Sequence, residues 1–91
     1  MRDRLERLLV ETRGGPRRAA IIEALDDEPA NPSRLAERLG LHDYPVRYHL
    51  AVLERHGVVV SGGDGYGEPY FLTEQFDHHY DAFERVLDRL E

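Results

Sequence analysis

One short run of residues has the types and spacing of a surface that could read a base sequence. Between residues 43 and 55, Val46, Leu50 and Leu53 recur at helical spacing and would share the buried side of a helix, with His49 packed beside them. The opposite side would carry Tyr44, Arg47, Tyr48 and Ala51. Arginine can donate two hydrogen bonds to the acceptor edge of guanine, tyrosine can contact phosphates or thymine methyl groups, and alanine allows close approach. The alternative is an ordinary solvated face that holds one arginine.

The residues just before this helix predict a shorter helix that would position it. Three apolar residues follow a helical period and a glycine then interrupts it: Leu35, Ala36, Leu39 and Gly40. Asn31 can cap this helix through its side-chain oxygen, and Pro32 suits the first helical position, where an N–H group is not needed. Two short helices joined by such a turn form a helix-turn-helix, whose second helix enters the major groove of DNA. We therefore predict a recognition helix at about residues 43–55.

Two further pairs of residues are candidates for holding the phosphates of a DNA backbone. Ser33 and Arg34 stand at the start of the shorter helix, where free N–H groups and the positive end of the helix dipole favour a phosphate. Arg17 and Arg18 begin an earlier helix, predicted from Pro16 through about Asp26. They could grip phosphate or could equally be ordinary surface residues.

After the second helix of the motif, the pattern changes from helical to alternating, which predicts strands. Residues 58–61 and 70–72 are rich in β-branched and aromatic side chains, and a glycine-rich segment separates them, so we expect a β-hairpin. The tip of this hairpin holds Asp64 and no arginine. Tyr66 is therefore the residue of this tip that we expect to touch DNA.

Both ends of the chain predict amphipathic helices. The first dozen residues have apolar side chains at helical spacing, and Thr73 can cap a final helix. The final helix carries a heptad seam of Phe76, Tyr80, Phe83, Leu87 and Leu90. The first helix carries a second stripe of Leu5, Leu8 and Leu9.

We expect these two stripes to form the interface of a homodimer, and the alternative is packing within one chain. A two-fold axis would place two recognition helices about 34 Å apart, one turn of DNA, and would predict a palindromic site.

No arrangement of residues predicts an enzyme, a cofactor or a metal site. There is no Ser/His/Asp order or phosphate-binding loop, and a short chain encloses little of a cleft. His78 and His79 invite a metal hypothesis, but adjacent histidines on a helix point about 100° apart and cannot easily bind one ion. We interpret them as part of a solvated face.

Length and composition predict one domain over residues 1–91, mainly α-helical with a small β-hairpin (α+β). Its expected parts are an N-terminal helix at 1–13, a winged helix-turn-helix core at 16–72 and a C-terminal helix at 73–91. The 91 residues include no cysteine, which excludes disulfides and thiolate metal sites. No apolar run approaches the roughly 20 residues of a membrane span, so we expect a cytoplasmic protein with no membrane partner.

The net charge of −6 is unusual for a protein that would bind DNA. Residues 1–63 hold ten arginines against ten acids, whereas residues 64–91 hold two against eight, so the excess acid lies in the tail. An acidic composition without lysine resembles that of proteins from salt-loving archaea. In about 1 M salt the screening length is only ~3 Å, which would nearly abolish long-range repulsion from DNA. The alternative is that the acidity excludes a nucleic-acid partner.

Four runs of sequence, in this order, resemble small archaeal winged helix-turn-helix transcriptional regulators, usually grouped as ArsR-like with PadR-like relatives. They are TRGGPRRAAIIEAL, NPSRLAERLGL, VRYHLAVLERHGVV and YGEPYFLTE, and the resemblance covers about Thr12 to Glu74. It implies a homodimeric regulator that binds double-stranded promoter DNA. Family members commonly carry Tyr-Lys/Asn-Thr where this chain has Asp43-Tyr44-Pro45, so a threonine that would cap the helix or contact phosphate is missing. A winged helix that serves as a protein–protein adaptor, without reading DNA, is the alternative function.

Overall fold

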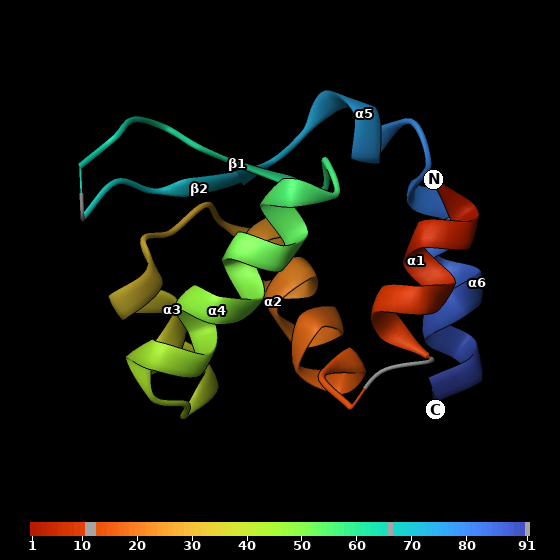
Figure 1. Ribbon diagram of the computed structural model, residues 1–91, viewed down its shortest axis with the longest axis horizontal. Coiled ribbons are helices and arrows are strands. Elements are labelled where there is room, and N and C mark those ends of the chain that lie inside the picture. The colour runs from red at the N-terminus through yellow and green to blue at the C-terminus, as the bar shows by residue number, and fades with distance from the viewer. Residues whose placement is uncertain (11–12, 66, 91) are drawn as a thin grey trace.

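The computed structural model describes residues 1–10, 13–65 and 67–90. For residue 90 it describes the backbone alone. Helices dominate this part of the chain, and a two-stranded antiparallel hairpin completes it (Figure 1), which confirms the expected fold class. No helix within these ranges combines the length and the apolar character needed to cross a membrane. The elements are α1 (Arg2–Leu9), α2 (Gly15–Asp27), α3 (Pro32–Leu39), α4 (Asp43–Arg55), β1 (Val59–Ser61), β2 (Tyr70–Leu72), α5 (Glu74–Asp77) and α6 (Tyr80–Leu90).

Helices α3 and α4 form the predicted helix-turn-helix, with the predicted cap. The side-chain oxygen of Asn31 accepts a hydrogen bond from the backbone N–H of Arg34 at 2.8 Å, and Pro32 is the first helical residue. Gly40 ends α3 in the left-handed conformation, with a φ of 66° that a residue with a side chain rarely adopts. These two devices fix where α3 begins and ends, and so fix where α4 can start.

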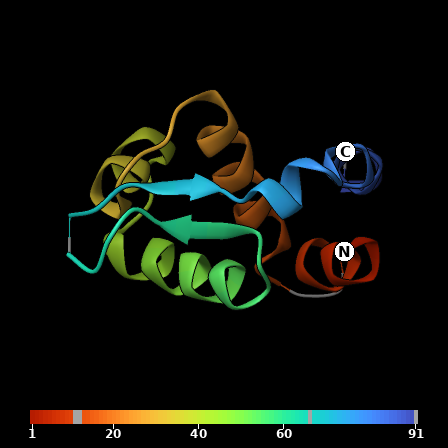
Figure 2. The same ribbon diagram turned by 90° about the horizontal axis from the view of Figure 1, so that it is seen from above.

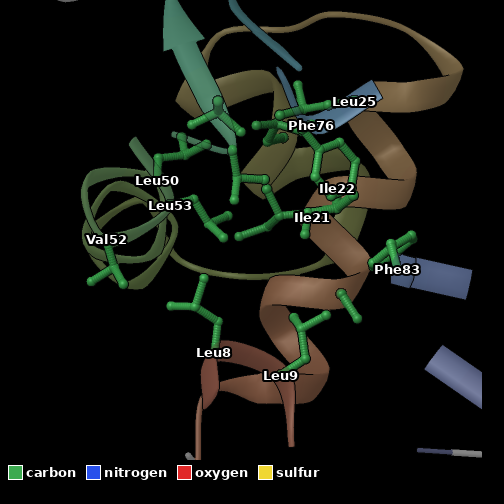
Figure 3. Close-up of a cluster of buried hydrophobic side chains, with 14 of the residues drawn as sticks. Leu8, Leu9, Ile21, Ile22, Leu25, Leu50, Val52, Leu53, Phe76 and Phe83 are labelled. Carbon is green, nitrogen blue, oxygen red and sulfur yellow. The ribbon is translucent and has the colours of Figure 1, made fainter. Parts of the chain in front are cut away.

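The hydrophobic core lies around α2, which contacts α1, α3, α4 and β2. Figure 3 shows side chains from α1, α2 and α4 converging in this space, together with Phe76 from the last part of the chain. Burial of these apolar side chains is the main term that holds α4 against the rest of the molecule. The fully buried side chains from the first four helices include Leu5, Leu9, Ile21, Ile22, Leu35, Val46, Leu50 and Leu53.

Strands β1 and β2 form the hairpin, which we call the wing and which includes the loop between them. Val59 pairs with Leu72 and Ser61 pairs with Tyr70 in antiparallel register. The N–H group of Tyr70 also donates to the carbonyl of Ala30 at 2.9 Å, which ties the wing to the segment before α3. Figure 2 shows the wing running alongside α4.

The ends of the chain differ from the expected pair of uninterrupted helices. Helix α1 ends at Leu9, earlier than the predicted dozen residues. Thr73 caps the next helix as predicted, because its hydroxyl oxygen accepts a hydrogen bond from the N–H of Phe76 at 3.0 Å. That helix, α5, lasts only four residues, and a turn at His78 and His79 separates it from α6.

The two apolar stripes meet within one chain, where α1 and α6 lie side by side (Figures 1 and 2). Arg89 of α6 also donates to the carboxylate of Glu6 in α1 at 3.0 Å. This corrects the expectation that the two stripes are open to a second chain, because packing within one chain already covers most of their residues. Tyr80 and Leu87 stay partly exposed, and the side chain of Leu90 lies outside the described residues. The predicted dimer residues that are buried in this way are Leu5, Leu8, Leu9, Phe76 and Phe83.

Candidate nucleic-acid interface

Helix α4 occupies residues 43–55, as predicted, and has one buried and one open side. Its inward residues Val46, Leu50 and Leu53 are fully buried in the core. On the other side Tyr44 is 80% exposed and Tyr48 is 52% exposed, and Ala51 is exposed as well. Exposed aromatic side chains that lie next to one another, unlike single ones, are typical of interaction sites. The open side therefore has the chemistry and the accessibility that contact with a partner requires.

Arg47 lies at the edge of this face that is nearer to the wing and is half-buried there. It lines a hollow of about 290 Å³ together with Glu54 of α4 and Asp64 and Tyr70 of the wing. Burial raises the pKa of Tyr70, the charge of Glu54 raises it further, and the positive charge of Arg47 opposes both. Arg47 is thus held between the open face of α4 and the wing.

The start of α3 presents Ser33 and Arg34 to solvent, as a phosphate contact would need. The hydroxyl of Ser33 donates a hydrogen bond to the side-chain oxygen of Asp43, at the start of α4, with a length of 3.2 Å. The N–H of Arg34 already serves the cap of α3, so its guanidinium group is the part left for a ligand. The two residues are brought to the same side of the motif, next to an acid.

Arg17 and Arg18 are neighbours in sequence but have different environments. Arg17 is exposed, whereas Arg18 is only 6% exposed and is therefore not available to phosphate, which corrects the prediction for this residue. The guanidinium of Arg18 donates to Nδ1 of His49 and to the carbonyl of Leu8, each at 3.2 Å. These two buried hydrogen bonds link α2 to α4 and to α1. Adjacent helical residues point in different directions, and here only one of the two faces solvent.

His49 is buried against this arginine, as expected for a packing residue. Burial lowers the pKa of the imidazole, and the charges of Arg18 and Arg17 lower it further. At pH 7 His49 is therefore neutral and accepts the hydrogen bond from Arg18.

A hollow of about 520 Å³ lies between the start of α2 and the first half of α4. Tyr44 and Tyr48 form one wall, and Arg13 and Arg17 contribute positive charge to the other. The prediction for Arg17 did not include Arg13, although it is an arginine just before the same helix. It also omitted Arg55, which follows Ala51 by four residues and so shares the open side of α4.

Two other features considered from the sequence add nothing to this site. Tyr66, the expected wing contact, lies outside the described residues. His78 and His79 are exposed in the turn before α6, and the described residues include no group of three or more His, Cys, Asp or Glu side chains that could hold a metal ion.

Two solved structures have a fold similar to that of this chain. A MarR family protein from Bacillus stearothermophilus has a TM-score of 0.68 and 18% identity, over 97% of this chain and 64% of that one. Wild-type ZitR from Lactococcus lactis, in complex with DNA, has a TM-score of 0.58 and 20% identity, over 80% of this chain and 55% of that one. The chain therefore spans less than two thirds of either protein. At these identities the likeness shows the fold alone.

None of the curated proteins compared with the chain matches it. The narrower resemblance to archaeal ArsR-like and PadR-like regulators stays a prediction. The sequence profile of a family described as "Helix-turn-helix domain" matches residues 16–61, which are 46 of the 91 residues. This match runs from the second residue of α2 to the last residue of β1 and so contains all of α3 and α4. The chain belongs to this helix-turn-helix domain family.

Proposed function

We propose that this protein is a sequence-specific regulator of transcription that binds double-stranded promoter DNA as a homodimer, with α4 in the major groove. The observation that carries the proposal is the open aromatic face of α4, with Tyr44 and Tyr48 more than half exposed. A helix held by its buried side and left open on the other is the geometry in which a helix-turn-helix presents its second helix to bases.

The open face of α4 supplies groups suited to base edges and phosphates. Arg47 would donate two hydrogen bonds to O6 and N7 of a guanine, because this pair matches the spacing of the guanidinium N–H groups. Tyr44 and Tyr48 would contact phosphates or thymine methyl groups, and Ala51 would let the helix approach the base pairs. The similarly folded ZitR, whose structure contains DNA, supports this assignment of partner.

The remaining contacts in this proposal go to the backbone. Arg17 is exposed beside α4, and Ser33 and Arg34 are exposed at the start of α3, where a phosphate would meet the guanidinium group of Arg34 and the positive end of the helix dipole. Tyr66 stays a proposed contact of the wing. Such contacts position a protein on the duplex, whereas base contacts specify the sequence.

The homodimer is the part of the proposal that rests on symmetry. Two copies related by a two-fold axis would place their α4 helices about 34 Å apart and would bind a palindromic site. Among the seam side chains that the structure describes, Tyr80 and Leu87 on α6 are partly exposed, and a second chain could cover them. Sedimentation equilibrium measures the oligomeric state, and a monomer at all concentrations would contradict this part.

An adaptor that binds another protein is the second candidate, and one observation favours it. The hollow between α4 and the wing contains the acids Glu54 and Asp64, which would repel a phosphate backbone on that side. An adaptor would show no preference among DNA sequences at any salt concentration.

A footprint on the DNA upstream of the protein's own gene, recorded at molar KCl, separates the two functions. We expect protection of a symmetric site by the parent protein and its loss in both Arg47→Ala and Tyr48→Ala. Arg85→Ala is the matched control, because Arg85 is an exposed arginine on α6, outside the proposed interface. Uniform cleavage at every concentration of the parent protein would refute the proposed function.

A further inference from the structure

Positive charge gathers on one side of α4, in a hollow that the sequence did not suggest. The hollow has a volume of about 260 Å³ and lies between α1 and the second half of α4. Leu8 and Val52 are among its apolar residues. Arginines from both helices surround them, namely Arg4, Arg7 and Arg55, next to His56.

These arginines lack acidic partners in the part of the chain that the structure describes. Ion pairs there involve Arg2, Arg38 and Arg89, and neither Arg7 nor Arg55 is among them. Both Arg7 and Arg55 are exposed. Arg4 is half-buried and donates to the carbonyl of His56 at 3.2 Å, which orients it without neutralising it.

The pKa of His56, beside the hollow, reflects this excess of positive charge. Burial lowers the pKa of His56, and the charges of Arg4, Arg55 and Arg7 lower it further. Several like charges held close together favour the binding of an anion, because an anion relieves their mutual repulsion.

The same side of α4 carries positive charge along its whole length. Tyr48 lines both this hollow and the one that contains Arg13 and Arg17. Figure 1 shows α1 and the start of α2 on one side of α4, with the wing extending away on the other. Apart from the buried Arg18, five arginines line these two hollows, and we call them the arginine track: Arg4, Arg7, Arg13, Arg17 and Arg55.

The wing side has the opposite charge. Glu54 and Asp64 line the hollow there, and the side chain of Glu68 lies close to Gly63 and Gly65 in the loop. No arginine or lysine occurs between Arg55 and Arg85, so the whole wing lacks a basic residue. A DNA backbone would therefore meet repulsion at the wing and attraction along the arginine track.

The dimensions of DNA indicate how a duplex would lie against the positive α1 side and the negative wing side of α4. The major groove is about 12 Å wide and a helix with its side chains is about 10–12 Å across, so a helix in the groove has a phosphate backbone on each flank. Resting on the proposed function, we propose that the duplex is anchored through the backbone strand on the α1 side of α4, by the arginine track, with Arg7 and Arg55 as its exposed centre. The wing contributes little to this anchoring.

The dependence of duplex affinity on KCl concentration tests the anchoring. Each phosphate contact contributes about −0.9 to the slope of log K against log salt. Loss of two contacts in the Arg7→Gln/Arg55→Gln double variant should make this slope less steep by about 1.8. A fourfold rise in KCl would then weaken the variant about 12-fold less than the parent protein. The loss of affinity should be similar for the promoter fragment and for a scrambled duplex, because phosphates carry no sequence information.

Arg85→Gln is the matched control and should leave the slope unchanged, and urea unfolding checks that the double variant is folded. An unchanged slope and affinity in the double variant, with specific binding still lost in Tyr48→Ala, would overturn the anchoring and leave the proposed function standing. No binding of any duplex by the parent protein would overturn both.

Discussion

Replacing Phe83 by alanine should destabilise a single chain strongly, because its ring belongs to that chain's own core. Phe83 is 0% exposed, and its ring centroid lies 5.6 Å from that of Phe76 and 5.4 Å from that of Tyr80. Truncating a buried phenylalanine to alanine costs about 3–5 kcal/mol, and the edge-on contacts with the two neighbouring rings favour the upper half of that range. A domain of this size has a total stability of roughly 5–14 kcal/mol, so the variant should still fold unless the parent protein lies at the bottom of this range.

Urea unfolding measures this loss. The dependence of the loss on protein concentration shows whether the seam forms within one chain or between two chains. With a slope of about 1 kcal/mol per molar urea, a loss of 3–5 kcal/mol moves the midpoint down by about 3 M or more. Phe71→Ala is the matched control, since this phenylalanine is 39% exposed on β2. We expect it to cost about 1 kcal/mol, in keeping with its partial burial.

The contacts between α1 and α6 lie within one chain, so this loss should be the same at all protein concentrations. If Phe83→Ala costs nothing at concentrations where the parent protein is monomeric, intrachain packing is refuted and the seam lies between two chains.

The other predictions concern the inside of the molecule and the turn of the helix-turn-helix. Arg18→Ala should cost about 2–4 kcal/mol in urea unfolding, because it leaves buried hydrogen-bonding groups without a partner, while Arg17→Ala should change stability by no more than about 0.5 kcal/mol. Because the pKa of His49 is lowered from the usual value of 6.5, stability should be full above pH 6.5 and should fall as the pH drops from there toward the lowered pKa. His49→Gln should flatten part of that pH profile, and an equally steep profile in the variant would exclude His49 as a cause. Gly40→Ala should cost about 1 kcal/mol, since the φ of 66° is unfavourable for alanine although open space surrounds the position, and an unchanged midpoint would contradict this.

The helix-turn-helix and the face of α4 could be predicted because local rules determine them. Asn31 and Pro32 start α3, and Gly40 ends it, through interactions with residues close in sequence. The period of the apolar residues then decides which side of α4 is buried. Tyr44 and Tyr48 lie outside that period and are exposed, as the pattern indicated.

The parts that could not be predicted depend on contacts between residues far apart in the chain. Arg18 looked like its neighbour Arg17, and only the packing of α1 and α4 against α2 buries it. The apolar period of the final helix suggested one continuous seam, but Phe76 belongs to α5, and the turn that follows it lets α6 fold back beside α1. The charged side chains of α1 lie beside α4 because residues far apart in the chain pack together. The sequence alone therefore did not indicate Arg7 as a residue of the site.

The central claim is that Arg47 of α4 reads a guanine in the major groove. Methylation interference on the promoter fragment tests it directly, because a methyl group on guanine N7 blocks the bidentate contact from arginine. We predict that methylation of one guanine in each half-site prevents binding of the parent protein and has no effect on the residual binding of Arg47→Ala. Binding by the parent protein that no methylated guanine weakens, or the same interference pattern in the variant, would contradict it.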